Sequence, residues 1–301
     1  MRMSPSTRNT PLAVAALPTV RRRQHGISLL ELMVGMAIGL LVIAVAMVGL
    51  MASRSLSGTV SDASLLQQQA SFIFRVIGQQ VRPAGSLYLN LQQPDASSSK
   101  NVATTPVVFE TTAAAVSGGN SYTPKTDTLS GTDTQLTVGY RRFKEAVFTQ
   151  TTVQTLARNC LGGPAVTATD QRFVNVFARN GSDLRCTGNA TTQPIAGNVA
   201  NFQLRYLQAS GQNTGSPKVQ YVDADTAKAD WSRITGVEVC LVLYGNEAID
   251  MPTTPVTGEG SSTYLDCDGS EINMTALPAP RTKRMHMVFR NTYQLRSQGV
   301  L

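Results

Sequence analysis

The most constraining feature of the sequence is a long apolar stretch near the N-terminus. It begins at Ile27, continues to about Ala52 and contains one charged residue, Glu31. At about 1.5 Å of rise per residue, a helix of this length can cross a hydrocarbon layer of roughly 30 Å. Three arginines at positions 21–23 precede it. Because basic residues tend to stay in the cytoplasm, this order predicts a membrane helix with a cytoplasmic N-terminus and an exported C-terminal part.

The carboxylate of Glu31 needs a partner in such a helix. Inserting a charged side chain into the membrane costs about 2.5–3.5 kcal/mol even on the milder scales, and no basic residue lies between positions 27 and 53. Cleavage after Gly26 would give Ile27 a positive α-amino group about one helical turn away, and a neighbouring subunit could bring the same amine to Glu31. We therefore expect Glu31 to be one half of a charge pair whose other half is the α-amine of a neighbouring subunit. The alternative is a simple signal anchor with an unpaired glutamate.

The residues around this position resemble a known processing signal. Gly26, followed by Ile-Ser-Leu-Leu-Glu at residues 27–31, is similar to the type III signal of type IV pilins and type II secretion pseudopilins. In those families a membrane aspartyl peptidase cuts after the glycine and methylates the new N-terminus. The resemblance implies cleavage between Gly26 and Ile27, N-methylation of Ile27 and an assembly role for Glu31. Ile27 stands where the families more commonly have Phe.

Beyond the apolar stretch, the helical pattern becomes one-sided. Apolar residues recur at spacings of three and four, with Ser, Gln and Arg between them: Leu56, Val60, Ala63, Leu66, Ala70, Ile73, Ile77 and Val81. This spacing predicts an amphipathic helix with one packed face, which Pro83 ends. We predict one helix from about residue 27 to residue 82. Residues 27–53 would lie in the membrane or filament core, and residues 54–83 against a globular head.

Residues 84–301 are rich in Ser, Thr, Gly, Asn and Val and are expected to form a β-rich head. Predicted strands cover residues 106–110, 135–140, 146–149, 172–178, 201–207, 218–222, 236–244 and 285–295. Residues 223–231 are predicted to form a short helix that packs Trp231 onto the sheet. The expected fold is α+β: a leader of residues 1–26, a long N-terminal α-helix that is first transmembrane and then amphipathic, and the head.

The net charge indicates no nucleic-acid partner. The formal charge is +7, from 26 basic and 19 acidic residues, but five of the basic residues are arginines in the leader. The mature chain therefore has 21 basic and 19 acidic residues. So small an excess is not the electrostatic signature of a nucleic-acid-binding protein, and nucleic acid is not an expected partner.

Four cysteines lie in the head: Cys160, Cys186, Cys240 and Cys267. An even number of cysteines in an exported domain predicts disulfide bonds. Three connectivities exist, and we favour the sequential pairs, which close loops of similar length. A zinc site is the alternative, but no C-x-x-C occurs and His286 is the single histidine of the mature chain.

The sequence indicates neither an enzyme nor a cofactor. It has no nucleophile motif, and His286 on a predicted strand favours a structural role. Asp266, Asp268 and Glu271 form an oxygen-rich turn with a glycine, which resembles half of a Ca²⁺ loop. The alternative for these three acids, and the one we favour, is a polar turn beside a disulfide bond.

A second resemblance concerns the helix end and the head. Arg82-Pro83-Ala84-Gly85 and residues 198–207, 231–243 and 289–292 are similar to PilW-type minor pilins. This implies a subunit that contacts other minor pilins and the major pilin through the N-terminal helix. It also implies a role in priming pilus assembly within a tip complex, together with a PilY-type adhesin. The protein would lie in the inner membrane, with its head in the periplasm, before it enters the pilus.

Three alternatives remain. The nearest is a type II secretion pseudopilin of the J type, which shares the leader and a β-rich head. The second is a subunit of a competence pilus that binds DNA, which predicts salt-sensitive binding. The third is a membrane-anchored exported enzyme.

Overall fold

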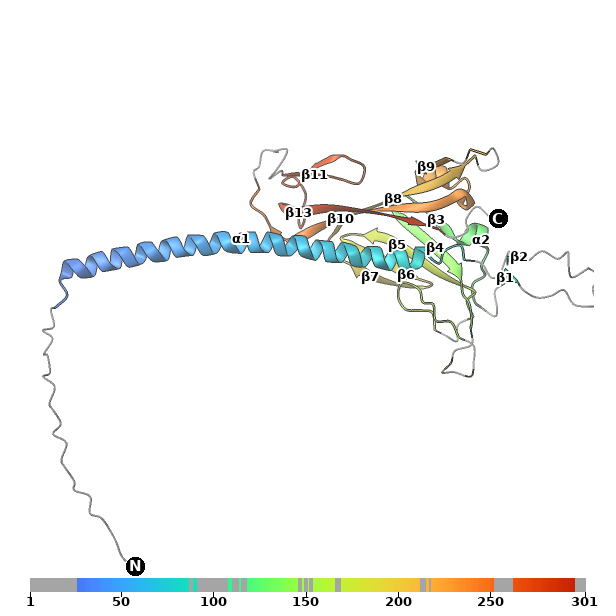
Figure 1. Cartoon of the computed structure of the whole chain (residues 1–301), viewed down its shortest axis with the longest axis horizontal. Helices are drawn as coiled ribbons and strands as arrows, with labels where there is room; N and C mark the ends of the chain where they lie inside the picture. Colours follow the sequence, from blue (N-terminus) through green and yellow to red (C-terminus); the bar gives the residue numbers. More distant parts are fainter. Residues whose placement is uncertain are drawn as a thin grey trace, which may run out of the picture. The chain divides into compact units, whose positions relative to one another are not determined.

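The computed structural model describes residues 26–86, 89–90, 108–109, 114, 118–145, 148, 151, 154–165, 169–211, 215–216, 218–251 and 262–295 (Figure 1). The chain divides into two compact units, Met1–Ser53 and Arg54–Leu301. Helix α1, Leu29–Val81, is 53 residues long and contributes to both units. The predicted fold class, a long N-terminal α-helix with a β-rich head, is confirmed.

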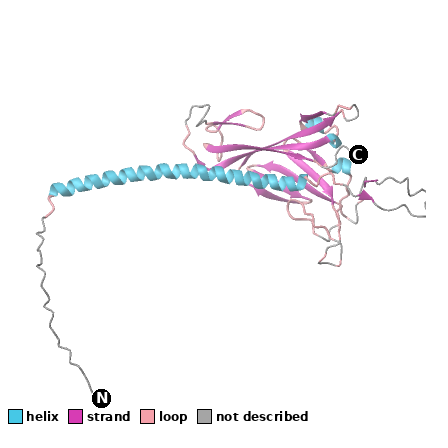
Figure 2. Ribbon diagram, viewed as in Figure 1, coloured by secondary structure: helices cyan, strands magenta, loops and turns pink. Residues whose placement is uncertain are grey.

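The second unit contains two antiparallel sheets (Figure 2). The four-stranded sheet has the order β13-β10-β8-β9, and the five-stranded sheet the order β3-β4-β5-β6-β7. Their strands are β3 (Leu129–Gly131), β4 (Gln135–Arg141), β5 (Arg172–Asn180), β6 (Asp183–Gly188), β7 (Thr191–Ala196), β8 (Val199–Ser210), β9 (Lys218–Val222), β10 (Ile234–Ala248) and β13 (Arg284–Gln294). Two small pairs are β1 (Leu89–Asn90) with β2 (Val108–Phe109), and β11 (Thr263–Leu265) with β12 (Glu271–Asn273).

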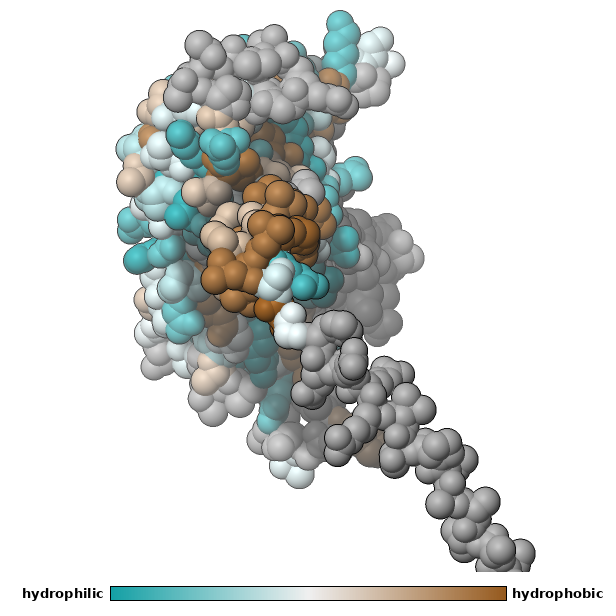
Figure 3. Space-filling view, turned by 90° about the vertical axis from the view of Figure 1, so that its left-hand side faces the viewer, coloured by the Kyte–Doolittle hydropathy of each residue, from teal (hydrophilic) through white to brown (hydrophobic). Residues whose placement is uncertain are grey.

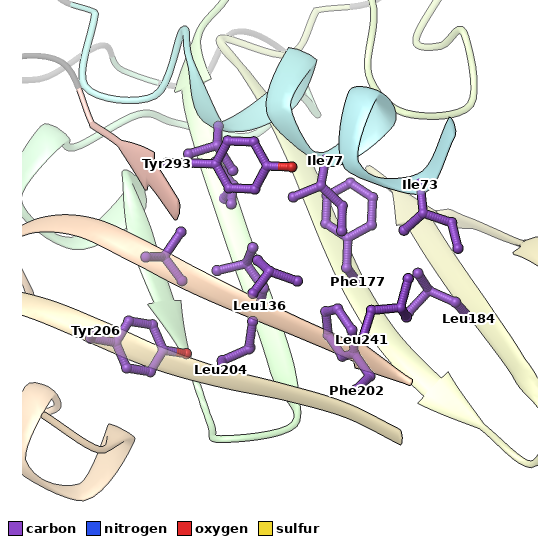
Figure 4. Close-up of a cluster of buried hydrophobic side chains, with 14 of the residues drawn as sticks. Ile73, Ile77, Leu136, Phe177, Leu184, Phe202, Leu204, Tyr206, Leu241 and Tyr293 are labelled. Atoms are coloured by element: carbon purple, nitrogen blue, oxygen red, sulfur yellow. The ribbon is translucent and has the colours of Figure 1, made fainter. Parts of the chain in front are cut away.

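One hydrophobic core joins the second half of α1 to both sheets (Figure 4). Alternation along each strand directs the apolar side chains into it. On β8, for example, Phe202, Leu204 and Tyr206 are buried while Arg205 is exposed. Ile73 and Ile77 of α1 belong to the same core. The second half of α1 is therefore part of the fold of the head and not a linker.

The buried face of α1 begins at a polar residue and not at the predicted Val60. Val60 is 69% exposed, whereas Asp62 is buried, so the prediction for Val60 is wrong. The Asp62 carboxylate accepts a hydrogen bond from the backbone N–H of Glu247 at 2.8 Å. It fits beside Gly245, where any Cβ would overlap its oxygen. A buried carboxylate satisfied by a strand end cannot be recognised from hydrophobic spacing. The side chain of Leu56 lies outside the described residues.

Tyr293 of β13 fixes the distance between α1 and the four-stranded sheet. Its hydroxyl donates to the backbone oxygen of Phe74 at 2.6 Å. Its ring lies over Gly78, where an added Cβ would be 2.8 Å from a ring carbon. Helix and strand approach this closely because Gly78 has no side chain.

Six of the predicted strands correspond to β4, β5, β8, β9, β10 and β13. No strand was predicted at β1, β3, β6, β7, β11 or β12. Of the strand predicted at 106–110, the described part is β2, Val108–Phe109. The strand predicted at 146–149 lies outside the described residues except for Phe148, which is in a turn.

The helix predicted at 223–231 is broken in two. Helix α3, Ala224–Ala227, is followed by a 3₁₀ turn, Trp231–Arg233. Each begins at its own cap, because Asp223 accepts from the Thr226 N–H and Asp230 from the Ser232 N–H. The ring of Trp231 meets Tyr206 of β8 edge-on, with centroids 5.0 Å apart, so the predicted packing of Trp231 on the sheet is confirmed. One further short helix, α2, covers Pro124–Asp127.

Candidate functional site

The first half of α1 exposes large apolar side chains along its length. The segment Leu29–Met51 is 23 residues long, its most apolar window has a mean hydropathy of 2.6, and none of that window is buried. Its hydrophobic side chains appear brown in Figure 3. Among the described residues it is the one helix that is long and apolar enough to cross a membrane. A helix that is apolar on every side requires lipid or other helices around it.

The N-terminus of α1 is built by Ser28 and Glu31. The Ser28 hydroxyl oxygen accepts a hydrogen bond from the backbone N–H of Glu31 at 3.2 Å, and the Leu32 N–H donates to the Ser28 carbonyl oxygen at 3.1 Å. Ser28 and Glu31 thus have the spacing of a capping box, and the carboxylate lies in the first helical turn. There its negative charge interacts favourably with the positive end of the helix dipole, even without a second chain.

Gly26 and Ile27 directly precede this cap, and both are exposed. The structure therefore leaves the predicted cleavage bond accessible, four residues before Glu31. Cleavage, N-methylation and pairing of the new amine with a carboxylate remain predictions, since each involves a second protein.

The four cysteines form two disulfide bonds, Cys160–Cys186 and Cys240–Cys267. They span 26 and 27 residues, and loops of this length correspond to about 3.5 kcal/mol of stabilisation in the chain-entropy account. The second bond fastens the β11–β12 hairpin to β10, in a small cluster with Val242 and Tyr244.

Of the three acids of the candidate Ca²⁺ loop, Asp266 and Asp268 lie in the turn of this hairpin and Glu271 begins β12, and all three hydrogen-bond within the head. Carboxylate oxygens of Asp266, Asp268 and Glu271 accept, in that order, from Asn201 Nδ2 at 2.9 Å, Ser270 N at 2.8 Å and Thr263 Oγ1 at 2.7 Å. The hydrogen bonds from Ser270 lower the pKa of Asp268. No group of three or more His, Cys, Asp or Glu side chains in the described parts of the chain is arranged to hold a metal ion.

His286 of β13 stacks on aromatic side chains of the neighbouring strands. Its ring is parallel to that of Tyr264, with centroids 4.7 Å apart, and lies 5.8 Å from that of Tyr244. Nδ1 is 2.9 Å from the carbonyl oxygen of Arg284 and donates to it in the matching tautomer, while the buried Nε2 has no hydrogen-bond partner among the residues that the structure describes. The imidazole therefore joins β10, β11 and β13 by packing.

Acid is expected to weaken the head through His286. Burial is the main cause that lowers the pKa of His286 below its ordinary value of 6.5; Arg281 lowers it further, and the bond to Arg284 and the charge of Asp266 partly offset this. The unfolded chain thus takes up a proton first, and stability falls as the pH drops from about 6.5 through the lower folded value, by at most about 1.4 kcal/mol per pH unit. Urea unfolding of the full chain in detergent at pH 7.5 and 5.5 measures this.

The matched variant for that experiment is His286→Phe. It keeps a ring between the tyrosines and removes the titration, so its stability should change less between the two pH values. An equal loss in the variant and in the wild type would assign the acid sensitivity to other groups.

Two family models match the chain. The family described as type IV pilus-assembly protein W matches residues 167–297, which include β5 to β13. The prokaryotic N-terminal methylation motif matches residues 21–47, which include the arginine cluster, Gly26, Ile27 and Glu31.

Other similarities are weaker. Among solved structures, a type IV-like pilin from Thermus thermophilus is 12% identical and aligns with a TM-score of 0.35, over 76% of this chain and 95% of that chain. A likeness this low carries no argument. No curated protein is significantly similar in sequence.

The two family matches lie at opposite ends of one chain. The methylation motif covers the processing signal and most of the exposed apolar helix, and the PilW match covers the strands β5 to β13 of the head with the Cys240–Cys267 bond. Together the two matches support a type IV pilin-like family for this chain.

Proposed function

We propose that the chain is a minor type IV pilin of the PilW kind. It is made as a prepilin, cut between Gly26 and Ile27, methylated on Ile27 and inserted into the pilus through α1. The observation that carries this proposal is the presence of the methylation motif and the pilus-assembly match in a single chain. The partner enzyme is then a prepilin peptidase with methyltransferase activity.

In this proposal the chain has four functional segments. Residues 1–26 are the cleaved leader, and residues 27–53 hold the protein in the inner membrane and later in the filament core. Residues 54–83 attach this helix to the head, and residues 84–301 form the head itself, on the periplasmic side before assembly. The charge order across the leader and the apolar helix supports that orientation.

Assembly would bury the exposed apolar helix among the helices of neighbouring subunits. Gly35, Gly39 and Gly49 have no atom within 4 Å of the position of an added Cβ, so they leave flat patches where another helix can approach. Packing of this kind supplies cohesion, and a charge pair between Glu31 and the α-amine of a neighbour supplies axial register. Buried polar groups contribute specificity of this kind more reliably than stability.

A priming role at the pilus tip follows from the PilW resemblance. The chain would join other minor pilins in a complex from which the major pilin is added, with a PilY-type adhesin as a further partner. Pilin-like proteins are structural and not enzymatic, and we propose a structural role for this chain on the same ground.

Deletion of the gene in its own host tests the priming role. We expect few surface pili, major pilin retained in the inner membrane, and recovery when the full chain is supplied. We also expect the mature chain in sheared filaments at far lower amounts than the major pilin. Normal piliation together with loss of secreted enzymes would instead identify a type II secretion pseudopilin.

A further inference from the structure

We infer that α1 uses its exposed second half to bind the helix of a different pilin-type subunit, one that places a carboxylate opposite Arg75. This inference rests on the proposed function and specifies the kind of partner. The surface is the outer seam, defined as Leu65, Gln68, Phe72 and Arg75.

The outer seam has the spacing of a helix-packing stripe. Its residues follow one another at intervals of three, four and three, and all four are exposed. Leu65 is 47% and Phe72 is 49% exposed, although both are large apolar side chains. An apolar pair seven residues apart, with polar residues between, matches the heptad pattern of a two-helix contact.

The inner face of the same helix is already occupied. Leu66, Ile73 and Ile77 are fully buried in the core of the head. Helix α1 therefore has one face committed to its own head and a second face open. A second partner on the outer seam would displace no contact of the first.

The surface beside Phe72 is hollowed. A shallow depression of about 460 Å³ is lined by Ser64, Gln67, Gln68, Ser71, Phe72 and Arg75. The short side chains of Ser64 and Ser71, two helical turns apart, leave this space next to the phenyl ring. A side chain from a facing helix can enter it as a knob enters a hole.

The charge of the outer seam argues against a second copy of this chain. Arg75 forms no ion pair within the part of the chain that the structure describes. Residues 54–82 contain one acid, Asp62, which is buried against β10. The same stretch of a second copy would thus bring Ser, Gln, Leu, Phe or Arg to Arg75. Because a cation removed from water without a counter-charge is costly, an acidic helix fits better.

The test uses the full chain expressed in its host. The variant Arg75→Glu should be processed like the wild type but enter sheared filaments at an amount about tenfold lower or less, relative to its amount in the membrane. Phe72→Ser should also lower incorporation. Arg75→Lys, which keeps the charge, and Arg179→Glu, a charge reversal on an exposed residue of β5, should enter normally. Reversing one acid of a co-assembling pilin to Lys should rescue Arg75→Glu.

Two results would overturn this inference and leave the proposed function standing. The first is normal incorporation of both Arg75→Glu and Phe72→Ser. The second is a Ser71→Cys variant that forms disulfide-linked dimers of this chain in filaments, since the described head has no free cysteine of its own. If the wild-type chain itself is neither processed nor found in filaments, the proposed function fails and the inference fails with it.

Discussion

Replacing Glu31 by Ala is expected to leave the cut after Gly26 intact and to lower the amount of mature chain in filaments by about tenfold or more. The reason is that the α-amine of a neighbouring subunit would then be buried without a counter-charge, and each loss of about 1.4 kcal/mol in association is tenfold in the equilibrium. Quantitative immunoblots of sheared filaments and of membranes measure the ratio.

The variant Ser28→Ala distinguishes the charge pair of Glu31 from the capping of the helix N-terminus. The Ser28 hydroxyl caps the first turn by accepting from the Glu31 N–H. Its loss costs roughly 0.5–2 kcal/mol at the helix end but keeps the carboxylate. We expect near-normal incorporation of Ser28→Ala. A defect as large as that of Glu31→Ala would assign the effect to the cap, and normal piliation with Glu31→Ala would remove the register role of the carboxylate.

Replacing Ile77 by Ala is expected to lower the free energy of unfolding of the head by about 2–5 kcal/mol, and Ile77→Val by about 0.5–1.5 kcal/mol. Ile77 is fully buried where α1 meets both sheets, so truncation leaves a cavity that rigid strands cannot fill. Urea unfolding of the full chain in detergent can be followed by Trp231, the single tryptophan, which packs on Tyr206.

Phe72→Ala is the matched control for this prediction. Phe72 lies on the same helix but on its exposed face, and surface substitutions usually change stability by less than about 0.5 kcal/mol. If Ile77→Ala were no more destabilising than Phe72→Ala, the second half of α1 would not belong to the core of the head.

Local patterns were sufficient to predict the helix and the main strands. The predicted helix of residues 27–82 differs from α1, Leu29–Val81, by a residue or two at each end. The reason is that an unbroken apolar run, a serine cap and a proline determine both ends locally. The alternating apolar residues of β8 and β10 likewise identify strands that bury one face.

Apart from β6, the strands that were missed have few buried apolar residues. On β7 the first four residues are exposed, and Thr192 pairs with Thr187 of β6 by a hydroxyl–hydroxyl contact of 2.7 Å. Such strands exist because the neighbouring strand supplies their hydrogen bonds, and this is invisible in their own sequence.

The surroundings of the candidate site residues could not be predicted, because they are made by contacts between segments far apart in the sequence. The β11–β12 hairpin reaches the sheet through His286 and the Cys240–Cys267 bond, and Asp62 meets the end of β10 across 185 residues. The proposed partner of Glu31 lies on another molecule, so that pairing is a property of the assembly and not of one chain.

We propose that proteolysis converts this chain into a filament subunit by creating a new amine beside Glu31. The most direct test is the intact mass of the protein recovered from filaments of its host. We expect a chain that begins at Ile27 and carries one added methyl group. A chain that still contains the arginines at positions 21–23 would contradict this proposal.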